Sequence, residues 1–492
     1  MLTDGFAVRA GLHAWPWCAR IHGIMPLTPL PFDRRSFLGS LSALAAAPAA
    51  AMPAPPQAAS PRSGSLEGDL LAAIEKIPLV NTHEHIIPEA ERVSLNVDFF
   101  TLAGHYAISD VISAGLAGDE LRLVRDESAS ARARWAAFEP HWKHARFTGY
   151  GQALRIAIED IYGAAEISAQ TIDGINDRIR AANKPGLYED VLQRRSNIAY
   201  SVLDDYWNAA PVKPDPRFFV YARKFDRFVA PQSVAEVQEL EKLTDVSITN
   251  LRGLKQAMER SFEQSLEAGM VNVKSTLAYA RQIHYAEVTE SRAESDVQML
   301  LKDGQSMPEG FRNRVERPYR AMEDHLFHHL IQLADTHRIP VQIHTGLHAG
   351  NGNFIENSKP THLTNLFFLY PNVKFDLFHI SYPYQGELSV LAKIFPNVYM
   401  DFCWAHIISG SLSRRAMHEM LETVPVNKIF GYGGDYRYPE LSYAHAKMAR
   451  RNVAQVMTEK VQEGFCTDAE ALEIAEMILH GNPHAMFGWR RG

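Results

Sequence analysis

The sequence has few cysteines, no excess of positive charge and no apolar run of membrane length. Its three cysteines, Cys18, Cys403 and Cys466, show no paired spacing, which excludes a disulfide framework and a thiolate zinc site. The 50 basic residues are outnumbered by 57 acidic ones and form no basic block, so a nucleic-acid partner is not expected. No stretch approaches the roughly 20 apolar residues that a membrane span needs, so we expect no stable membrane anchor.

What the chain does contain is apolar residues and histidine. With 492 residues and 46% hydrophobic content, it can bury a large core, and this excludes a disordered chain. The length is typical of several domains, but one α/β barrel can also account for it. The 21 histidines favour a metal site, because neutral imidazole is the commonest metal ligand in proteins.

Residues 1–60 are predicted to be a signal and leader. Arg34 and Arg35 precede an apolar run from about Phe37 to Ala47, and the alanines at 49–51 offer a small-residue cleavage site. This pattern is typical of a twin-arginine export signal, and it predicts a periplasmic or secreted protein. A disordered alanine-rich tail is the alternative interpretation.

Eight short β-rich runs alternate with helical patterns in the rest of the chain. The runs are 77–81, 197–203, 218–222, 270–274, 340–344, 373–379, 398–402 and 428–433. Helical patterns at 316–337, 384–395 and 411–423 fit between the later runs. Strands that alternate with helices indicate parallel βαβ units, and eight such units close into a barrel. We therefore predict an α/β fold, a (β/α)₈ TIM-type barrel over residues 70–490, with a large, mainly helical insertion at about 90–195 that covers the pocket.

Ligand-type residues fall where these strands end. His83 and His85 follow the first strand, His344 ends the fifth, His379 ends the sixth and Asp435 follows the eighth. The carboxyl ends of barrel strands converge on one mouth, so these side chains should meet there. Two histidines at i and i+2 of an extended segment point the same way and can reach one ion. Three imidazoles with one carboxylate suit Zn²⁺ or a similar divalent ion.

Six motifs carry a resemblance to a known family. They are VNTHEH at 80–85, QIHTG at 342–346, FDLFHIS at 375–381, YMDFCWA at 399–405, FGYGGDYRYPE at 430–440 and ILHGNPHAMFG at 478–488. In order and position they resemble the amidohydrolase superfamily, specifically its amidohydrolase-related branch. The chain is most similar to the amidohydrolase-like domains fused to glutamine-synthetase-like domains, and the Asp-x-Arg after the eighth strand resembles uronate isomerases. The resemblance implies a barrel with a divalent metal at its mouth and, usually, hydrolysis of C–N or C–O bonds.

The resemblance also implies roles for individual residues. His83, His85, His344 and Asp435 match the metal positions, with Zn²⁺ as the expected ion. His379 matches the sixth-strand histidine, which in mononuclear members acts as an acid or base beside the metal. A metal lowers the pKa of bound water to roughly 7, so Asp435 can be both a ligand and a proton shuttle.

Four basic residues are candidates for binding the substrate. Lys274 ends the fourth strand, where binuclear relatives hold a carboxylated lysine that bridges two ions, but we favour one ion and a lysine that binds a substrate carboxylate. Arg437 should line the same mouth and suits bidentate binding of a carboxylate, or else forms an ion pair with Glu440. Arg281, beyond the fourth strand, and His348, in the glycine-rich loop HTGLHAGNGN, are further candidates.

Two further residues near the ligands have less direct predicted roles. Glu84 should point away from the ion, because neighbours on a strand alternate in direction, and so should support the ligands. Trp404 is either a wall of the pocket or part of the core.

The first functional hypothesis is a metal-dependent hydrolase. It would act on an amide, lactone or related carbonyl bond of a small, carboxylate-bearing substrate. The alternatives are a metal-dependent non-oxidative decarboxylase, a uronate-isomerase-like sugar-acid isomerase and, from another class, a binding protein without turnover. A small molecule is the expected partner, and a homo-oligomer stays open.

Overall fold

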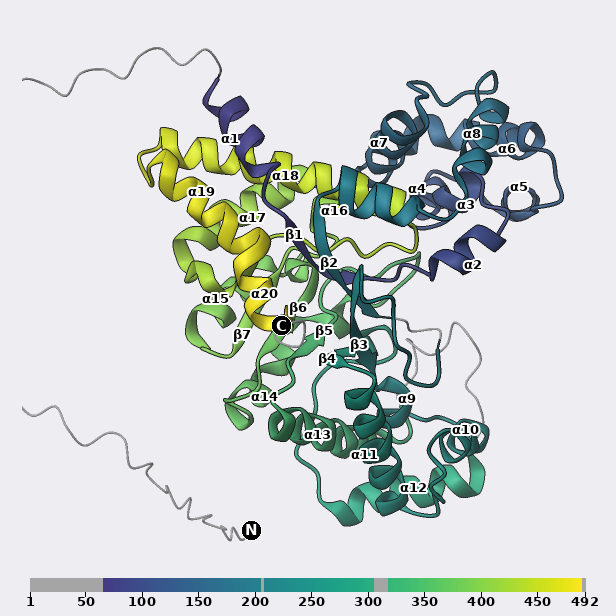
Figure 1. Ribbon diagram of the computed structural model, residues 1–492. Helices are drawn as coiled ribbons and strands as arrows, with labels where there is room; N and C mark the ends of the chain where they lie inside the picture. The colour runs from purple at the N-terminus through teal and green to yellow at the C-terminus, as the bar shows by residue number, and fades with distance from the viewer. Residues whose placement is uncertain (1–64, 205–207, 305–316, 489–492) are drawn as a thin grey trace, which may run out of the picture. The chain divides into compact units, whose positions relative to one another are not determined.

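Eight parallel strands form the centre of the computed structural model, which describes residues 65–204, 208–304 and 317–488 (Figure 1). The strands are β1 Leu79–Glu84, β2 Ile198–Asp204, β3 Phe219–Lys224, β4 Met270–Ser275, β5 Val341–Ile343, β6 Phe375–Leu377, β7 Val398–Asp401 and β8 Ile429–Phe430. Each pairs with the next in parallel, in the order β1 to β8. The predicted α/β barrel is confirmed. The predicted export signal lies outside the described residues.

Backbone hydrogen bonds between β1 and the segment after β8 close the barrel. Thr82 donates to the Tyr432 carbonyl at 3.2 Å, and His85 donates to the Tyr436 carbonyl at 3.0 Å. Asp435 in turn donates to the His83 carbonyl at 2.9 Å. These bonds hold both ligand-bearing segments side by side at the mouth.

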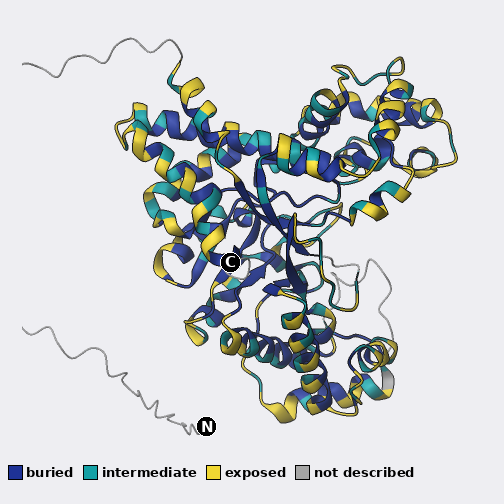
Figure 2. Cartoon of the chain, viewed as in Figure 1, coloured by how far each residue is buried: buried dark blue, intermediate teal, exposed yellow. Residues whose placement is uncertain are grey.

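Helices surround the strands as in a βα barrel. Those outside the insertion are α1 Leu66–Ile74, α9 Asp226–Val229, α10 Val234–Thr244, α11 Leu251–Glu267, α12 Glu290–Asp303, α13 Arg320–His337, α14 Thr364–Leu369, α15 Gln385–Ile394, α16 Ala405–Ile408, α17 Gly410–Thr423, α18 Pro439–Gln462, α19 Asp468–Glu476 and α20 Asn482–Phe487. The strands are buried and the outer helix faces are exposed (Figure 2). Short β-rich runs that end in a polar residue or glycine are the pattern that predicted these strands. Among the described residues, none of the helices has the length and apolar character needed to cross a membrane.

The insertion between β1 and β2 is helical, as predicted, and has its own core. Its helices are α2 Glu89–Ser94, α3 Phe99–Ala103, α4 Ala107–Ser113, α5 Gly118–Arg125, α6 Ala131–Ala145, α7 Gly149–Tyr162 and α8 Ile172–Ala182. Phe99, Trp135, Phe138 and Trp142 pack ring against ring at its centre. The same apolar cluster continues into residues that follow β6, β7 and β8, such as Trp404. The insertion is thus packed directly on the loops at the barrel mouth.

Several residues at this mouth adopt left-handed backbone conformations, among them His379, Trp404 and Asp435. His379 has φ 61°, Trp404 has φ 63° and Asp435 has φ 62°. Non-glycine residues seldom adopt positive φ, and such strain concentrates at functional sites. These three residues follow β6, β7 and β8, where the ligand-type side chains gather.

Candidate metal centre and active site

Three of the predicted ligands converge on one point. His83 Nε2 and His85 Nε2 lie 3.2 Å apart, and Asp435 Oδ1 is 3.5 Å from the first and 3.2 Å from the second. A tetrahedral ion with bonds of roughly 2.05 Å holds its ligand atoms about 3.3 Å apart. The spacing and the chemistry of these three atoms therefore fit one divalent ion.

One backbone carbonyl fixes which ring nitrogen of His85 faces the place where the three ligand atoms converge. His85 Nδ1 lies 2.8 Å from the Asp204 carbonyl oxygen. Because a carbonyl can only accept, Nδ1 carries the hydrogen and Nε2 keeps its lone pair for an ion. Burial, reinforced by the charge of Lys274, holds the pKa of His83 well below its ordinary value, so this imidazole also stays neutral.

His344 and His379 form a second pair beside the three ligands. His379 Nδ1 donates to the Cys403 carbonyl at 2.9 Å, and His344 Nε2 donates to the Leu347 carbonyl at 2.8 Å. The two remaining nitrogens, His379 Nε2 and His344 Nδ1, then face each other with lone pairs at 3.1 Å. Such a pair binds a proton or a cation between its atoms. In the structure His344 pairs with His379. That His344 also binds the ion held by His83, His85 and Asp435 stays a prediction.

Asp435 is the anion at the centre of the site. Burial alone would raise the pKa of Asp435, but the neighbouring imidazoles and the positive charge of Lys274 hold it below its usual range. Both imidazoles of the first group approach Oδ1. Asp435 is therefore a carboxylate at neutral pH, and Oδ2 is the oxygen available for a proton.

Lys274 is a buried cation at the end of β4. Its side chain is 1% exposed, and its Nζ lies 3.4 Å from the centroid of the Phe378 ring. No carboxylate of the described residues lies within ion-pair distance of Nζ. Burial lowers the pKa of Lys274, while the charges of Asp204 and Asp435 oppose that shift. A buried cation without a close anion is costly unless a ligand or a modification supplies the counter-charge.

The other predicted substrate residues have different surroundings. His348 is 4% exposed, and its ring packs against Tyr279 and His344 at centroid distances of 4.5 and 5.3 Å. Both of its ring nitrogens are buried without a hydrogen-bond partner among the described residues. Arg437 lies half-buried in the loop that carries Asp435. The carboxylate that was its suggested ion-pair partner, Glu440, pairs with Arg92 at 2.5 Å.

Arg281 is not placed with this group. Its guanidinium is fully buried and donates to Glu323 at 2.8 Å and to Asp324 at 2.5 Å. Two carboxylates already neutralise the guanidinium. Its other hydrogen bonds in the described part of the chain go to the backbone carbonyls of Gln282 and His284, not to the imidazoles of the ion site. These contacts give Arg281 a structural role that links the segment after β4 to α13, in place of the predicted one in substrate binding.

Glu84 supports the loop after β8, as its position on the strand predicted. It accepts from the Tyr436 amide and the Asn81 side chain at 2.7 Å each, and also from Ser442. The carboxyl lies so close to Gly434 that a Cβ there would be 1.8 Å from Oε1. Glu84 therefore fixes the segment in which Asp435 stands.

The insertion contributes aromatic groups that sequence reasoning missed. Burial and the nearby charge of Asp435 raise the pKa of Tyr106 well above its ordinary value, so its hydroxyl keeps its proton beside that carboxylate. The Tyr106 ring stacks on Trp404 at 4.8 Å and on Tyr150 at 5.2 Å. His105 accepts from the Arg437 amide at 3.3 Å. Trp404 is fully buried and packs edge-on against His379 at a centroid distance of 5.0 Å. No sequence signal in the insertion singles out Tyr106.

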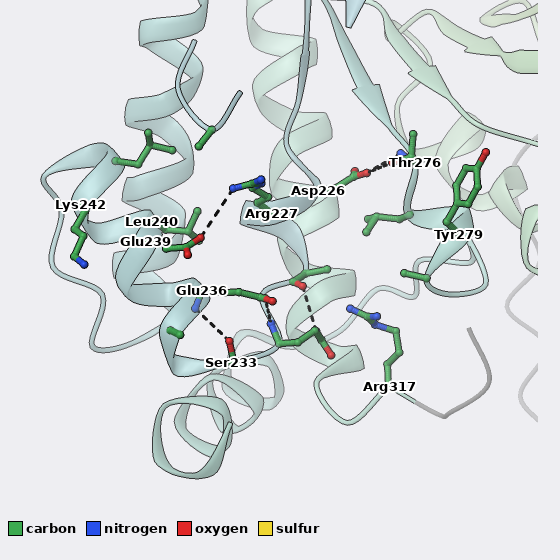
Figure 3. Close-up of a pocket in the computed structure, with 17 residues that line it drawn as sticks. Asp226, Arg227, Ser233, Glu236, Glu239, Leu240, Lys242, Thr276, Tyr279 and Arg317 are labelled. Atoms are coloured by element: carbon green, nitrogen blue, oxygen red, sulfur yellow. Dashed lines mark hydrogen bonds and ion pairs between the residues drawn. The ribbon is translucent and has the colours of Figure 1, made fainter. Parts of the chain in front are cut away.

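A pocket of about 1180 Å³ lies beside the imidazoles, between α10 and the segment after β4. Figure 3 shows Thr276 and Tyr279 on one side of it and Ser233, Glu236 and Leu240 of the α10 region on the other. Tyr279 lines the pocket and also contacts the ion site, because its ring packs on His344 at a centroid distance of 4.6 Å. The pocket therefore borders the site through this one ring.

Comparison with known proteins adds sequence similarity to this geometry. Residues 310–489 match the family model for amidohydrolases. Over 149 residues the chain is 33% identical to protein fluG of Emericella nidulans, a match that covers 30% of this chain and only 17% of that protein. Over 470 residues it is 21% identical to a uronate isomerase of Corynebacterium efficiens, covering 87% of this chain and 97% of that one.

Solved structures share the fold at low sequence identity. Glucuronate isomerase from Caulobacter crescentus superposes with a TM-score of 0.68 at 18% identity, covering 86% of this chain and 94% of that chain. A protein from Lactobacillus casei, described as a candidate metal-dependent hydrolase, superposes with a TM-score of 0.61 at 16% identity, covering 86% and 98%. At these identities the likeness concerns the fold alone.

Proposed function

We propose that the chain is a metal-dependent hydrolase of the amidohydrolase superfamily, because it has an eight-stranded parallel barrel and residues 310–489 match the family model for amidohydrolases. The bond cleaved is an amide, lactone or related carbonyl bond. The substrate is a small molecule that carries a carboxylate.

The observation that carries this proposal is the spacing of His83 Nε2, His85 Nε2 and Asp435 Oδ1, each 3.2 to 3.5 Å from the others. These atoms would hold one divalent ion. When bound, the ion supplies a Lewis acid that polarises the carbonyl and makes water a nucleophile near neutral pH. Zn²⁺ is the ion that we expect.

Asp435 and His379 supply the proton transfers. In hydrolysis the water oxygen bonds to the carbonyl carbon, and the bond from that carbon to the leaving nitrogen or oxygen breaks. One proton moves from the attacking water to the leaving atom. Asp435 is ionised and can accept this proton on Oδ2, while the Tyr106 hydroxyl keeps its own proton beside the carboxylate. His379 Nε2, with its lone pair fixed by the bond from Nδ1 to Cys403, is placed to pass the proton on.

Lys274 and Arg437 hold the substrate carboxylate in this proposal. Lys274 is buried without a close anion, so a carboxylate that enters the site supplies its missing counter-charge. Arg437 follows Asp435 by two residues on the same loop and adds a planar guanidinium that can bind two carboxylate oxygens. Both charges lie on strand-end segments, which keeps the substrate next to the ion site.

The test is a panel assay on the full chain reconstituted with Zn²⁺. The panel consists of N-acyl amino acids, carboxylate-bearing lactones and neutral analogues of the same compounds. We expect hydrolysis of a carboxylate-bearing member, its loss in His83→Asn, and a rise in KM of about 10-fold or more in Lys274→Met, since a charge-assisted contact contributes roughly 1.5–3 kcal/mol. The matched control is the neutral analogue, whose KM should not change in Lys274→Met. Equal effects on both analogues would contradict the role of Lys274.

A sugar-acid isomerase is the second candidate. It is favoured by the similarity to a uronate isomerase over 97% of that protein and by Arg437 two residues after Asp435. Conversion of D-glucuronate to a ketose acid, with no hydrolysis in the panel, would replace the hydrolase proposal with this one. Release of CO₂ from a carboxylate substrate would indicate a decarboxylase instead.

A further inference from the structure

Asp204, the last residue of β2, is a buried acid that the proposed reaction does not use. Its side chain is fully buried at the carboxyl end of the strand, on the same edge of the barrel as the histidines. Neither carboxylate oxygen has a hydrogen-bond donor among the described residues. The Nζ of Lys224 is 3.7 Å from Oδ2, an ion pair that is longer than a hydrogen bond.

A buried carboxylate in this state lacks what normally stabilises it. Buried charges in proteins are paired and hydrogen-bonded or coordinate a metal, because transfer from water into the interior is costly. One loose ion pair leaves most of the lone pairs of Asp204 unsatisfied. The missing donors at both oxygens therefore favour a ligand that is itself a cation.

The neighbours of Asp204 are the imidazoles of the ion site. One carboxylate oxygen of Asp204 and one ring nitrogen each of His83 and His85 all lie within 4.8 Å of one another. The largest separation of two ligand atoms on one ion is about 4.2 Å, twice a bond of roughly 2.1 Å, so a movement of about 0.6 Å or less would bring these three atoms within reach of one ion. The Asp204 backbone carbonyl also holds His85 through Nδ1, so the side chain and the imidazole are fixed to the same short segment.

We propose that Asp204 supplies a second carboxylate ligand to the ion held by His83, His85 and Asp435. This inference rests on the proposed metal-dependent function and extends its ligand set beyond the strands on which the sequence motifs stand. Two imidazoles and two carboxylates would neutralise a divalent ion. Oxygen-rich sites also suit Mn²⁺ better than sites made of nitrogen alone, so Mn²⁺ should bind well beside Zn²⁺.

The experiment measures ion binding to the full chain, independent of turnover. The apoprotein is titrated with Mn²⁺, and the Co²⁺ form is examined by visible absorption, which reports the number and type of ligands. We expect Asp204→Asn to weaken Mn²⁺ binding by about 10-fold or more and to alter the Co²⁺ spectrum. Even the loss of a residue that only hydrogen-bonds to a metal ligand weakens binding by about this much. Asp204→Glu, which keeps the carboxylate, should recover part of both.

Two variants control for general effects. Asp226→Asn alters another buried carboxyl, at the start of α9, whose Oδ2 accepts from the Thr276 amide at 2.7 Å, and it should leave Mn²⁺ affinity unchanged. Lys224→Met removes the cation that competes for Asp204 and should not weaken Mn²⁺ binding. Thermal unfolding of each apoprotein shows that it is folded.

The outcomes separate this inference from the proposed function. Mn²⁺ affinity in Asp204→Asn within twofold of the wild type, with an unchanged Co²⁺ spectrum, would overturn the inference and leave the ion site intact. Equal weakening in Asp204→Asn and Lys224→Met would also overturn it, because Asp204 would then act as a counter-charge to Lys224. A wild-type chain that binds neither ion would refute the proposed function itself.

Discussion

His348 shows how much a single side chain can indicate before any ligand is known. A neutral imidazole has one donor and one acceptor, and burying both without partners costs roughly 1–3 kcal/mol for each group. Burial lowers the pKa of His348 to about 4, so a charge does not offset this cost at neutral pH. Its neighbours Tyr279 and His344 belong to the site wall, which makes a polar group of the substrate the natural partner.

We therefore expect His348→Phe to raise KM by about 10-fold, because one hydrogen bond to the substrate of roughly 1 kcal/mol or more is lost. The ring stays in place, and removing two unpaired buried nitrogens should leave the melting temperature unchanged or higher. Steady-state kinetics and thermal unfolding check both expectations. An unchanged KM together with a lower melting temperature would show that His348 serves packing alone.

At the scale of elements, short polar contacts fix the helices to the barrel. His406 in α16 donates from Nε2 to the Gly431 carbonyl at 2.9 Å, and its Nδ1 accepts from Asn452 of α18 at 3.2 Å. Three segments that are distant in sequence thus meet at one neutral imidazole. Burial lowers the pKa of His406 from 6.5 to about 4, because a charged ring would be desolvated there.

This shift predicts a dependence of stability on pH. Between pH 6.5 and 4 the unfolded chain binds a proton at His406 that the folded chain does not, so stability falls as pH falls through this window. The shift corresponds to about 3 kcal/mol. His406→Gln, which can keep both hydrogen bonds, should unfold at a temperature that depends less on pH from 6.5 to 4. Parallel curves for the two proteins in this window would contradict the assignment.

The contact between the insertion and the barrel makes a second prediction at this scale. Gly149 begins α7, and a Cβ at this position would lie 1.9 Å from the Ile407 carbonyl oxygen. Gly149→Ala must push α7 away from α16 and shift the neighbouring Tyr150, which stacks on Trp404. We expect a loss of about 1–3 kcal/mol in stability and lower activity.

Gly174 offers the matched control for this substitution. It lies in α8 of the same insertion, and a Cβ there would meet no atom within 4 Å. Gly174→Ala should be neutral or stabilise the protein by up to about 1 kcal/mol, since alanine favours helix more than glycine does. If both variants behave alike, the approach of α7 to α16 does not matter for stability.

For the whole molecule, the ion site connects strands from both ends of the chain. His83 and His85 come from β1 and Asp435 from the segment after β8, so a bound ion should reinforce the closure of the barrel. An ion that binds only the folded state stabilises it by about 4 kcal/mol at a concentration 1,000 times its Kd. Removal of the ion by a chelator should therefore lower the melting temperature, and added Zn²⁺ should restore it.

Elemental analysis of the purified chain should give one ion per chain, unchanged in Lys274→Ala. This result follows if Lys274 holds substrate and the three-atom group holds the ion. Two ions in the wild type that fall to one or none in Lys274→Ala would instead indicate a carboxylated lysine that bridges two ions, with the second near His344 and His379. The comparison therefore decides between the two interpretations of the Lys274 position.

The sequence by itself determined the barrel and most of its mouth. The strands are short β-rich runs separated by helical patterns, and parallel strands all end at one edge, so polar residues at those ends had to meet. This reasoning placed His83, His85, His379 and Asp435 together. The predicted second strand ends at residue 203, whereas β2 ends at Asp204. One more residue would have placed Asp204 among the polar residues at the strand ends.

Only the tertiary structure decided how these groups are paired. Tyr106 reaches Asp435 from an insertion of about 100 residues, whose packing depends on contacts that no local pattern encodes. Likewise, His344 faces His379, which lies 35 residues further along the chain, and Arg281 is neutralised by carboxylates of α13. Local periodicity specifies strands and their ends, whereas partners far apart in sequence are specified by packing.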